Sequence, residues 1–289
     1  MKAHSVLLAL FLLIGYTINI VAQVDRNLRF THLTNDNGLP TNTIYSLCQD
    51  FKGFIWIATA NGLCKYDGRS ISVYEVEPTK GERKKGGIIR HVFEDKRHRL
   101  WVITHKGVNL YNRNKDNFNF VSVDSLNNFS RVIYQDDKGK IYMGGSGAFI
   151  YNEQTSKFDP FYVNQDETIT AFITAITSDQ KGQMWFGRMY GGLICADVEN
   201  GKLTRYKHND HNINSLISNK VTSLFTDHHG RIWIGTEDKG ICYFDSSTNK
   251  FIRIEGFPQI CVRTFAEDAE GNIWIGSENG LYIYLSDEN

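Results

Sequence analysis

The chain has 289 residues, and its 32 lysines and arginines are matched by 32 aspartates and glutamates, so the formal net charge is zero. A balanced charge gives no support to a nucleic-acid binder or to a protein held on an anionic membrane surface, and we expect neither partner. Beyond the N-terminal segment, no apolar run approaches the roughly 20 residues that span a bilayer. The length suits one large folded domain.

The first 22 residues differ from the rest of the chain. Lys2 supplies a positive start, residues 6–14 form an unbroken apolar run, and Ile20, Val21 and Ala22 precede Gln23 as a cleavage site. This order is typical of a secretory signal peptide that is cleaved after export. An uncleaved membrane anchor is the competing interpretation, and the short apolar core disfavours it. The sequence therefore predicts a signal peptide over 1–22 and a periplasmic domain over 23–289.

From residue 50 onward, a short unit recurs six times. Each copy begins with Asp and carries an aromatic residue six positions later, and five of the six copies have Gly three positions after the Asp. The pairs are Asp50–Trp56, Asp95–Trp101, Asp136–Tyr142, Asp179–Trp185, Asp227–Trp233 and Asp268–Trp274. The aromatic residues are separated by 45, 41, 43, 48 and 41 positions, and all five tryptophans of the chain occupy this register. A repeat of about 40–50 residues predicts an all-β propeller in which each repeat is one blade.

The residues around each pair predict the strands of a blade. Asp at the first and Gly at the fourth position suit a type I turn. His98 replaces that Gly in the second copy, so we expect its turn to be the most distorted. The following strand is apolar in succession, as in Ile232–Ile234, which indicates burial on both faces. The connections are too short for crossover helices, so the pairing is antiparallel.

Each unit is expected to supply four strands, and the number of blades that close the ring stays open. Leu28–Leu33 resembles an outer strand without a blade of its own, and the sixth unit, which ends near Tyr284, lacks an outer strand. Either that segment completes a closed six-bladed ring, or the ring is an incomplete seven-bladed one. A two-sheet sandwich with coincidental repetition is the less favoured fold.

Two segments, Phe30–Thr59 and Tyr206–Gly235, resemble repeats of the periplasmic regulator propeller found in hybrid two-component sensors. The shared pattern is Asp-x-x-Gly-x-hydrophobic-Trp-hydrophobic-Gly-Thr, followed by Gly-Leu and then Tyr or Phe with Asp. The resemblance implies an exported receptor domain for carbohydrate-derived ligands, often oligosaccharides. It also implies signalling through a membrane helix to a histidine kinase. Neither of these is found in the sequence, so we interpret the chain as a first propeller truncated before them.

Motifs for catalysis are absent from the sequence. It contains no phosphate-binding Gly-Lys-Ser/Thr loop, no His-Glu-x-x-His and no Gly-x-Ser-x-Gly. The turn aspartates are spread around a ring, and the loop histidines emerge at opposite ends of the blades, so neither group provides convergent ligands. We therefore expect no catalytic residue, no metal and no cofactor. The five cysteines are odd in number and lie mostly within strand patterns, which favours buried thiols over disulfides.

A candidate ligand site follows from the register of the inner strands. Five residues before the turn Asp, near the start of each inner strand, stand Tyr45, Arg90, Arg131, Thr174, Thr222 and Arg263. Three arginines in one register would bring guanidinium groups to one mouth of the central channel, where they suit a carboxylate or a sulfate. The alternative is that each arginine pairs with a carboxylate of a neighbouring blade, such as Glu94 or Glu267.

Loops between the second and third strands should end at the same rim. There Arg188 and Tyr190 interrupt an otherwise small Gly-Thr pattern, and His105 occupies the corresponding loop of the second unit. An aromatic residue beside an arginine is typical of a recognition surface. We therefore expect an extracellular ligand-sensing module, with two alternatives: a propeller glycosidase or lyase, and a propeller for protein–protein assembly, including a homodimer.

Overall fold

The computed structural model describes residues 31–76, 87–104, 106–121, 123, 130–161, 169 and 171–285. The expected signal peptide over 1–22 and the first part of Leu28–Leu33 lie outside the described residues. Within the described residues there are 23 strands and one short 3-10 helix, Asn35–Asn37. None of the helices that are described is long and apolar enough to cross a membrane.

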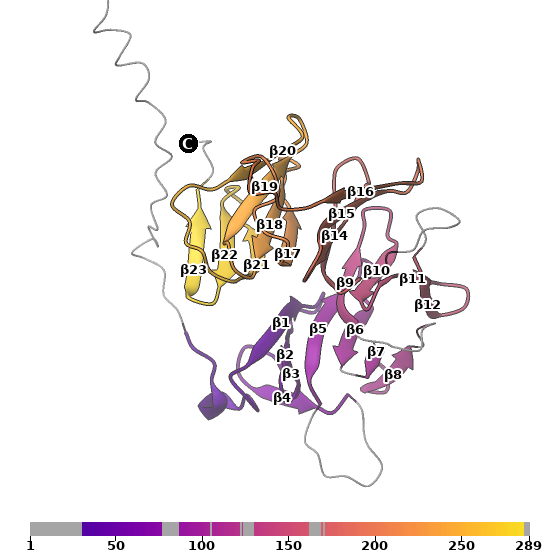
Figure 1. The fold of residues 1–289 in the computed structure, drawn as a ribbon. Coiled ribbons are helices and arrows are strands. Elements are labelled where there is room, and N and C mark those ends of the chain that lie inside the picture. Colours follow the sequence, from indigo (N-terminus) through magenta and orange to yellow (C-terminus); the bar gives the residue numbers. More distant parts are fainter. Residues whose placement is uncertain are drawn as a thin grey trace, which may run out of the picture.

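The strands form six separate antiparallel sheets, one for each repeat, placed in chain order around an axis as the blades of a β-propeller (Figure 1). The first blade contains β1 (Ile44–Gln49), β2 (Ile55–Thr59), β3 (Gly62–Tyr66) and β4 (Ile71–Tyr74), and the second contains β5 (Ile89–Glu94), β6 (Leu100–Thr104), β7 (Gly107–Asn112) and β8 (Asn117–Val121). The third contains β9 (Ser130–Gln135), β10 (Ile141–Gly145), β11 (Ala148–Asn152) and β12 (Lys157–Pro160), and the fourth contains β13 (Ile173–Ser178), β14 (Met184–Arg188), β15 (Gly192–Asp197) and β16 (Lys202–Tyr206). The fifth contains β17 (Val221–Thr226), β18 (Ile232–Thr236), β19 (Ile241–Asp245) and β20 (Lys250–Arg253), and the sixth contains β21 (Val262–Glu267), β22 (Ile273–Ser277) and β23 (Gly280–Tyr284).

The propeller predicted from the repeat is therefore confirmed. In each blade the strands pair with their neighbours in sequence, and the first strand of the blade is the inner one. Five blades have four strands, and the sixth has three within the described residues. The missing outer strand of the sixth unit was already visible in the sequence.

A single aspartate fixes the turn between the first two strands of each blade. In the first blade, Asp50 Oδ1 accepts hydrogen bonds from the backbone N–H groups of Lys52 and Phe54, both at 3.0 Å. Asp50 Oδ2 accepts the indole N–H of Trp56, also at 3.0 Å. The sequence predicted that the aspartate closes the turn. The structure shows that it also accepts the hydrogen bond of the aromatic side chain.

The same aspartate–aromatic bond is present in the other five blades. The distances from the Asp Oδ2 to the aromatic donor are 2.9 Å for Trp101, 3.3 Å for Tyr142, 3.2 Å for Trp185, 2.8 Å for Trp233 and 2.8 Å for Trp274. The spacing of six residues is therefore the spacing at which a turn carboxylate meets a ring that is buried in the sheet. A buried indole N–H needs such a partner, because leaving it without an acceptor costs about 1–3 kcal/mol.

The turn with His98 keeps the hydrogen bond of the other turns with a different backbone angle. The His98 N–H donates to Asp95 O at 2.8 Å, the distance that Gly53 keeps to Asp50 O. His98 has a left-handed backbone with φ 61°, whereas the glycines at the same position of the other five turns have φ between 78° and 86°. Of the six turns, this one therefore departs most from the common backbone angle, and histidine adopts the left-handed region at an energetic cost that glycine does not have.

The hydrophobic core is divided into six clusters. Five of them lie at the junctions of consecutive blades, and the sixth packs Leu39 against the first blade. At the last junction, Trp233 and Ile241 of the fifth blade pack against Val262, Phe265 and Ile273 of the sixth. The aromatic anchor thus faces the next blade along the chain. Because both faces of a middle blade meet a neighbour, its second strand is apolar without alternation.

Polar contacts join consecutive blades at the turn end. The residue after the turn Asp donates its backbone N–H to the side chain that ends the next inner strand. Phe51 donates to Glu94 at 3.1 Å, and His228 donates to Glu267 at 3.0 Å. These bonds hold the turn of one blade on the edge of the next.

All five cysteines are free thiols, and four of them are buried: Cys64, Cys195, Cys242 and Cys261. This agrees with the expectation of buried thiols. Burial raises the pKa of Cys242 to about 12 and that of Cys64 to about 11. Both thiols are therefore protonated and unreactive at neutral pH.

Replacement of the turn aspartate should destabilise the domain far more than replacement of an exposed aspartate. Asp227→Ala removes the acceptor of Trp233 and of the Arg231 backbone N–H, and we expect a loss of about 2–4 kcal/mol in the free energy of unfolding. Urea unfolding followed by tryptophan fluorescence measures this. Asp210→Ala, at an exposed ion pair with His208, is the control and should cost less than about 0.5 kcal/mol. Equal costs would contradict the structural role of the aspartate.

Acid should destabilise the domain through the same carboxylates. Burial opposes the ionisation of Asp50 and Asp268, but hydrogen bonds from Trp56 and Trp274 outweigh burial and lower both pKa values. A pKa lower in the folded than in the unfolded state gives a stabilisation that is complete above the unfolded pKa, and it is lost as pH falls through the folded pKa. We expect Tm to fall steeply below about pH 4.

The matched control is the double variant Asp50→Asn with Asp268→Asn. Its Tm should be lower at pH 6 and should change less between pH 4 and pH 2, because two titrating groups have been removed. Parallel pH profiles for the variant and the parent would contradict this origin of the acid sensitivity.

Candidate functional site

Every inner strand contains a β-bulge at its second residue. The register to the second strand shifts between the first and third residues of the inner strand, as between Ile89 and His91 in the second blade. The residues passed over in this way are Tyr45, Arg90, Arg131, Thr174, Thr222 and Arg263. A bulge takes one residue out of the ladder and redirects its side chain. The position that the sequence register singled out is therefore structurally special in all six blades.

These bulged residues lie together at one end of the propeller axis. Ile89, which begins β5, pairs with Thr104, which ends β6, and the other blades repeat this pairing. The inner strands of consecutive blades also pack on one another around the axis (Figure 1). The expectation that inner strands begin at the rim where second strands end is confirmed.

Three arginines from three blades come close enough for their charges to interact. Burial lowers the pKa of Arg131, and the positive charges of Arg90 and Arg263 lower it further. We call these three residues the arginine cluster. Like charges gathered in a partly buried place repel one another, so the cluster has an unfavourable energy that a bound anion would relieve.

Arg131 and Arg263 have different environments. The Arg131 guanidinium carbon lies 5.7 Å from the centre of the Phe172 ring, a cation–π contact. Arg263 forms an ion pair with Glu278 of its own blade. Within the described residues, Arg131 makes no ion pair with a carboxylate. Its charge is thus balanced only by an aromatic face.

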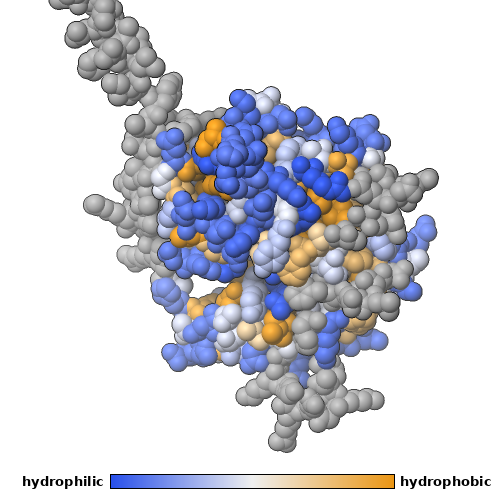
Figure 2. Space-filling model, viewed as in Figure 1, coloured by the Kyte–Doolittle hydropathy of each residue, from blue (hydrophilic) through white to orange (hydrophobic). Residues whose placement is uncertain are grey.

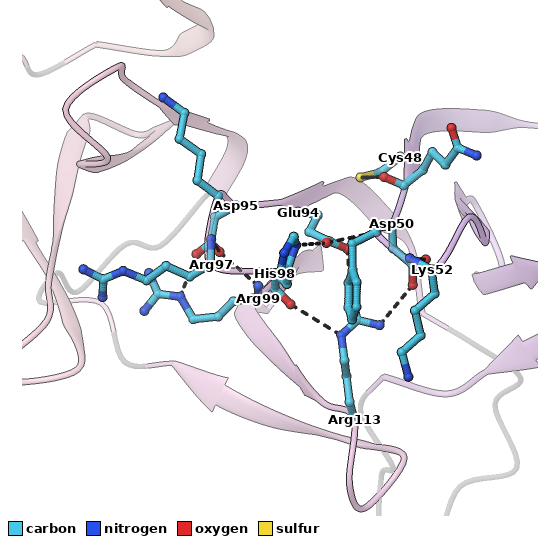
Figure 3. Close-up of polar contacts among 12 residues, drawn as sticks. Cys48, Asp50, Lys52, Glu94, Asp95, Arg97, His98, Arg99 and Arg113 are labelled. Atoms are coloured by element: carbon cyan, nitrogen blue, oxygen red, sulfur yellow. Dashed lines mark hydrogen bonds and ion pairs between the residues drawn. The ribbon is translucent and has the colours of Figure 1, made fainter.

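The alternative partners considered for these arginines are engaged elsewhere. Glu94 binds Arg113 at 2.9 Å and His98 at 3.0 Å, and Arg113 also binds Asp50 at 3.0 Å. Figure 3 shows this network at the turn end of the first two blades, with Arg113 reaching up between Asp50 and Glu94. Glu267 pairs in the same way with His228. Both carboxylates are therefore paired with other side chains at the turn end of the blades.

The two bulged threonines tie blades together. Thr174 Oγ1 donates to Val221 O of the next blade at 2.6 Å, and Thr222 Oγ1 donates to Val262 O at 2.6 Å. Both side chains are buried. The ring of bulges therefore has a structural side in the fourth and fifth blades and a charged side in the second, third and sixth.

The loop residues expected at the site are separate from the arginine cluster. Arg188 ends β14, and its guanidinium donates to Gly191 O within its own hairpin. Burial and the charge of Arg205 lower the pKa of Arg188. Tyr190 is 79% exposed, and no contact joins it to the cluster. His105 lies outside the described residues.

An acid–base pair is not found among the bulged residues, none of which is a histidine or a carboxylate. The nearby His91 of β5 accepts the backbone N–H of Ile133 at 3.4 Å, and burial lowers its pKa to about 4. Its ring is therefore neutral at neutral pH and links the second and third blades. Within the described residues, no group of three or more His, Cys, Asp or Glu side chains could hold a metal ion. The site is suited to binding an anion.

Three segments of the chain match the family described as two component regulator propeller, namely residues 38–61, 215–238 and 256–279. The chain carries regulator-propeller repeats. Each matched segment runs from the link before an inner strand, through the aspartate turn, to just past the second strand. The regulator-propeller unit therefore coincides with the part of the blade that contains the bulge and the aspartate–aromatic bond.

Solved structures similar to this chain include extracellular domains of hybrid two-component systems. The extracellular domain of the hybrid two-component system BT3049 from B. thetaiotaomicron superposes with a TM-score of 0.75 and 23% identity, over 89% of this chain and 35% of that chain. That of BT4673 superposes with a TM-score of 0.70 and 26% identity, over 87% and 33%. The protein is thus a propeller domain like the extracellular regions of hybrid two-component systems, and it spans about a third of their length.

The fold of this chain is also similar to that of an enzyme. Virginiamycin B lyase from Staphylococcus aureus superposes with a TM-score of 0.62 and 13% identity, over 86% of this chain and 85% of that chain. At this identity the likeness carries no activity to the regulator propeller. No curated protein sequence matches the chain.

Two features of the site were missed by the sequence analysis. Phe172, which lies against Arg131, directly precedes the inner strand of the fourth blade, and an aromatic residue beside the arginine register was a usable signal. The bulge had no signal of its own, because residues such as Arg90 and Thr222 do not differ in type from ordinary strand residues.

Thr222→Val tests whether the bulged threonine acts as a link between blades. The substitution keeps the shape of the side chain and removes the bond to Val262 O, so we expect a loss of about 1–2 kcal/mol in unfolding free energy. Thr248→Val, at an exposed turn of the fifth blade where the hydroxyl binds Asp245, is the control and should cost less than about 0.5 kcal/mol. If both variants unfold at the same urea concentration, the link contributes nothing.

Proposed function

We propose that this chain is the ligand-sensing propeller of an exported two-component receptor and that it binds a negatively charged, carbohydrate-derived ligand at the arginine cluster. The regulator-propeller repeats and the likeness to extracellular domains of hybrid two-component systems support the receptor role. The proposal places the domain in the periplasm. It assigns no phosphotransfer step to any residue of this chain.

The arginine cluster is the observation that carries the proposal. Arg131 is partly buried, lies near two further positive charges and has no carboxylate partner within the described residues. A guanidinium in such a place binds carboxylate or sulfate oxygens with two parallel N–H···O bonds. The Phe172 ring beside it offers an apolar face for a sugar ring. A uronic acid or a sulfated sugar combines both features.

The bulged residues differ in type from blade to blade, and this difference decides which blades can contact an anionic ligand. Arg90, Arg131 and Arg263 occupy the charged side, whereas Thr174 and Thr222 are committed to bonds between blades. A ligand that enters along the axis would therefore meet arginines of the second, third and sixth blades and none from the fourth and fifth. We propose that Arg188 and Tyr190, on the same rim, contribute to contact with longer ligands.

Binding to the purified protein tests this function. We would titrate three probes by calorimetry: a neutral tetrasaccharide, a uronate-containing tetrasaccharide and the sulfated form of the latter. The acidic probes should bind at least about 10-fold more tightly than the neutral one, because each charge-assisted hydrogen bond contributes about 1.5–3 kcal/mol. Raising the salt concentration should weaken their binding.

Variants locate the site. Arg131→Gln should weaken binding of the acidic probes by about 10-fold or more, since it removes the positive guanidinium and leaves a neutral polar side chain. Arg69→Gln, at an exposed turn of the first blade, is the control of equal charge change and should leave binding unaltered. Equal binding of all three probes, or equal effects of the two variants, would remove the arginine cluster from the site. A complete lack of binding would contradict a saccharide ligand.

A further inference from the structure

The residue that follows the second strand of a blade has a defined place at the rim of the channel. Its backbone N–H donates to the carbonyl two residues before the bulged residue, as Glu278 does to Cys261 O at 3.1 Å and Glu237 does to Lys220 O at 2.9 Å. The first and fourth blades contain the same bond. It holds this residue beside the start of the inner strand. We call this place the rim position.

In the sixth blade, the residue at the rim position binds the bulged residue of the same blade. The Glu278 carboxylate accepts a hydrogen bond from the Arg263 guanidinium and forms an ion pair with it. In the fifth blade, the equivalent Glu237 pairs with Lys220 at 3.3 Å, and the bulged Thr222 donates to the backbone of the sixth blade. A carboxylate at the rim therefore reaches the arginine cluster through Glu278.

The ion pair between Arg263 and Glu278 is open to water. Their side chains are 54% and 53% exposed, whereas Asp50, which binds Arg113 at the turn end, is 0% exposed. In the view of Figure 2, the surface over the fifth and sixth blades is mostly hydrophilic. An exposed ion pair contributes little to stability, because water replaces either partner at small cost. Glu278 can therefore leave Arg263 without unfolding the blade.

Arg263 acts on the rest of the arginine cluster through its charge. Burial lowers the pKa of Arg131, and the charges of Arg90 and Arg263 lower it further. By pairing with Arg263, Glu278 reduces the positive potential that an anion meets beside Arg131. The Glu278 carboxylate and an anionic ligand thus require the same guanidinium.

We propose that Glu278 is an internal competitor of the ligand, which occupies Arg263 and is displaced by an anionic group of the ligand. The inference rests on the proposed function, because it assumes that an anion binds at the arginine cluster. It divides the cluster into two parts. Arg131, which contacts the Phe172 ring and makes no ion pair within the described residues, binds a first anionic group directly. Arg263 binds a second group when that group displaces Glu278.

This competition selects for ligands that carry more than one negative charge. A singly charged ligand binds Arg131 and leaves the pair between Arg263 and Glu278 intact. A second carboxylate or sulfate exchanges one ion pair for another, so its net gain is smaller than the gain at a guanidinium without a partner. Glu278 therefore sets a threshold, which only a well-placed second charge passes.

Calorimetric titration with the sulfated uronate tetrasaccharide tests the competition. Glu278→Gln keeps the size of the side chain and removes its charge, so Arg263 is released. We expect binding to tighten by about 3–5-fold, which is the effect of one exposed ion pair. The variant should keep its Tm within about 2 °C of the parent, because both partners are exposed.

Glu237→Gln is the matched control. It removes the same charge at the equivalent rim position of the neighbouring blade, where the partner is Lys220 and not a residue of the arginine cluster. Burial raises the pKa of the Cys261 thiol, and the charges of Glu278 and Glu237 raise it further, so both carboxylates act at the start of the sixth inner strand. The control should change the affinity by less than about 2-fold. Equal effects of the two variants would overturn the proposal.

A double-mutant cycle separates local competition from a change in overall charge. In the Arg263→Gln background, the further change Glu278→Gln should alter the affinity by less than about 1.5-fold, because no guanidinium is left to release. If Glu278→Gln tightens binding by the same factor in both backgrounds, Glu278 acts only through its charge at a distance and the proposal fails.

The titration of the parent chain keeps this inference apart from the proposed function. If the acidic probes do not bind the parent, the proposed function is contradicted, and the competition is decided by Glu278→Gln alone. Binding that appears in this variant and is lost when Arg263→Gln is added supports the competition. A lack of binding in Glu278→Gln as well overturns it.

Discussion

The hydrogen bond between a turn aspartate and the aromatic ring six residues later is the interaction on which the rest of this propeller depends. One carboxylate oxygen closes the turn, and the other satisfies the only polar atom of a ring that is otherwise enclosed by hydrocarbon. The bond fixes the height of the ring in its sheet. Since the ring faces the next blade, the position of every junction follows from it.

A second constraint acts between blades. The glycine two residues after the aromatic anchor leaves a hollow that admits the first residue of the next inner strand, as Gly187 admits Val221. The backbone conformation of the inner strand just after that contact contains the bulge. The junction and the proposed ligand site thus use consecutive residues. The residue that packs against the glycine of the preceding blade is followed by the bulged residue, which lies outside the ladder.

In this arrangement, the residues that pack the blades together are similar in most blades, whereas the bulged residue differs from blade to blade. The residue in the hollow and the turn aspartate serve packing, so their types recur from blade to blade. The bulged residue lies outside the ladder, and it is tyrosine, arginine or threonine in different blades without any change of fold. A binding site can therefore be assembled from one position per blade, and here three of the six are arginines that meet near the axis.

The sequence by itself determined the blade. Its repeat length, its Asp–aromatic spacing and its unbroken apolar strands are local signals, because each depends on contacts within one unit or on burial of both faces of a sheet. They predicted the number of repeats, the antiparallel pairing and the strands, including the three that the sixth blade has within the described residues. The register that contains Arg90, Arg131 and Arg263 was also readable, because equivalent positions in a repeat must lie at equivalent places around an axis.

Only the tertiary structure decided how units meet. The sequence left Glu94 and Glu267 as possible partners of the arginines, and the structure gives those carboxylates to Arg113 and His228, which lie at the opposite end of the blade. It also showed that His98 adopts a left-handed backbone and that Phe172 lies against Arg131. Each of these depends on distances between residues far apart in the chain, and such distances follow from the curvature of the whole ring, which no single repeat encodes.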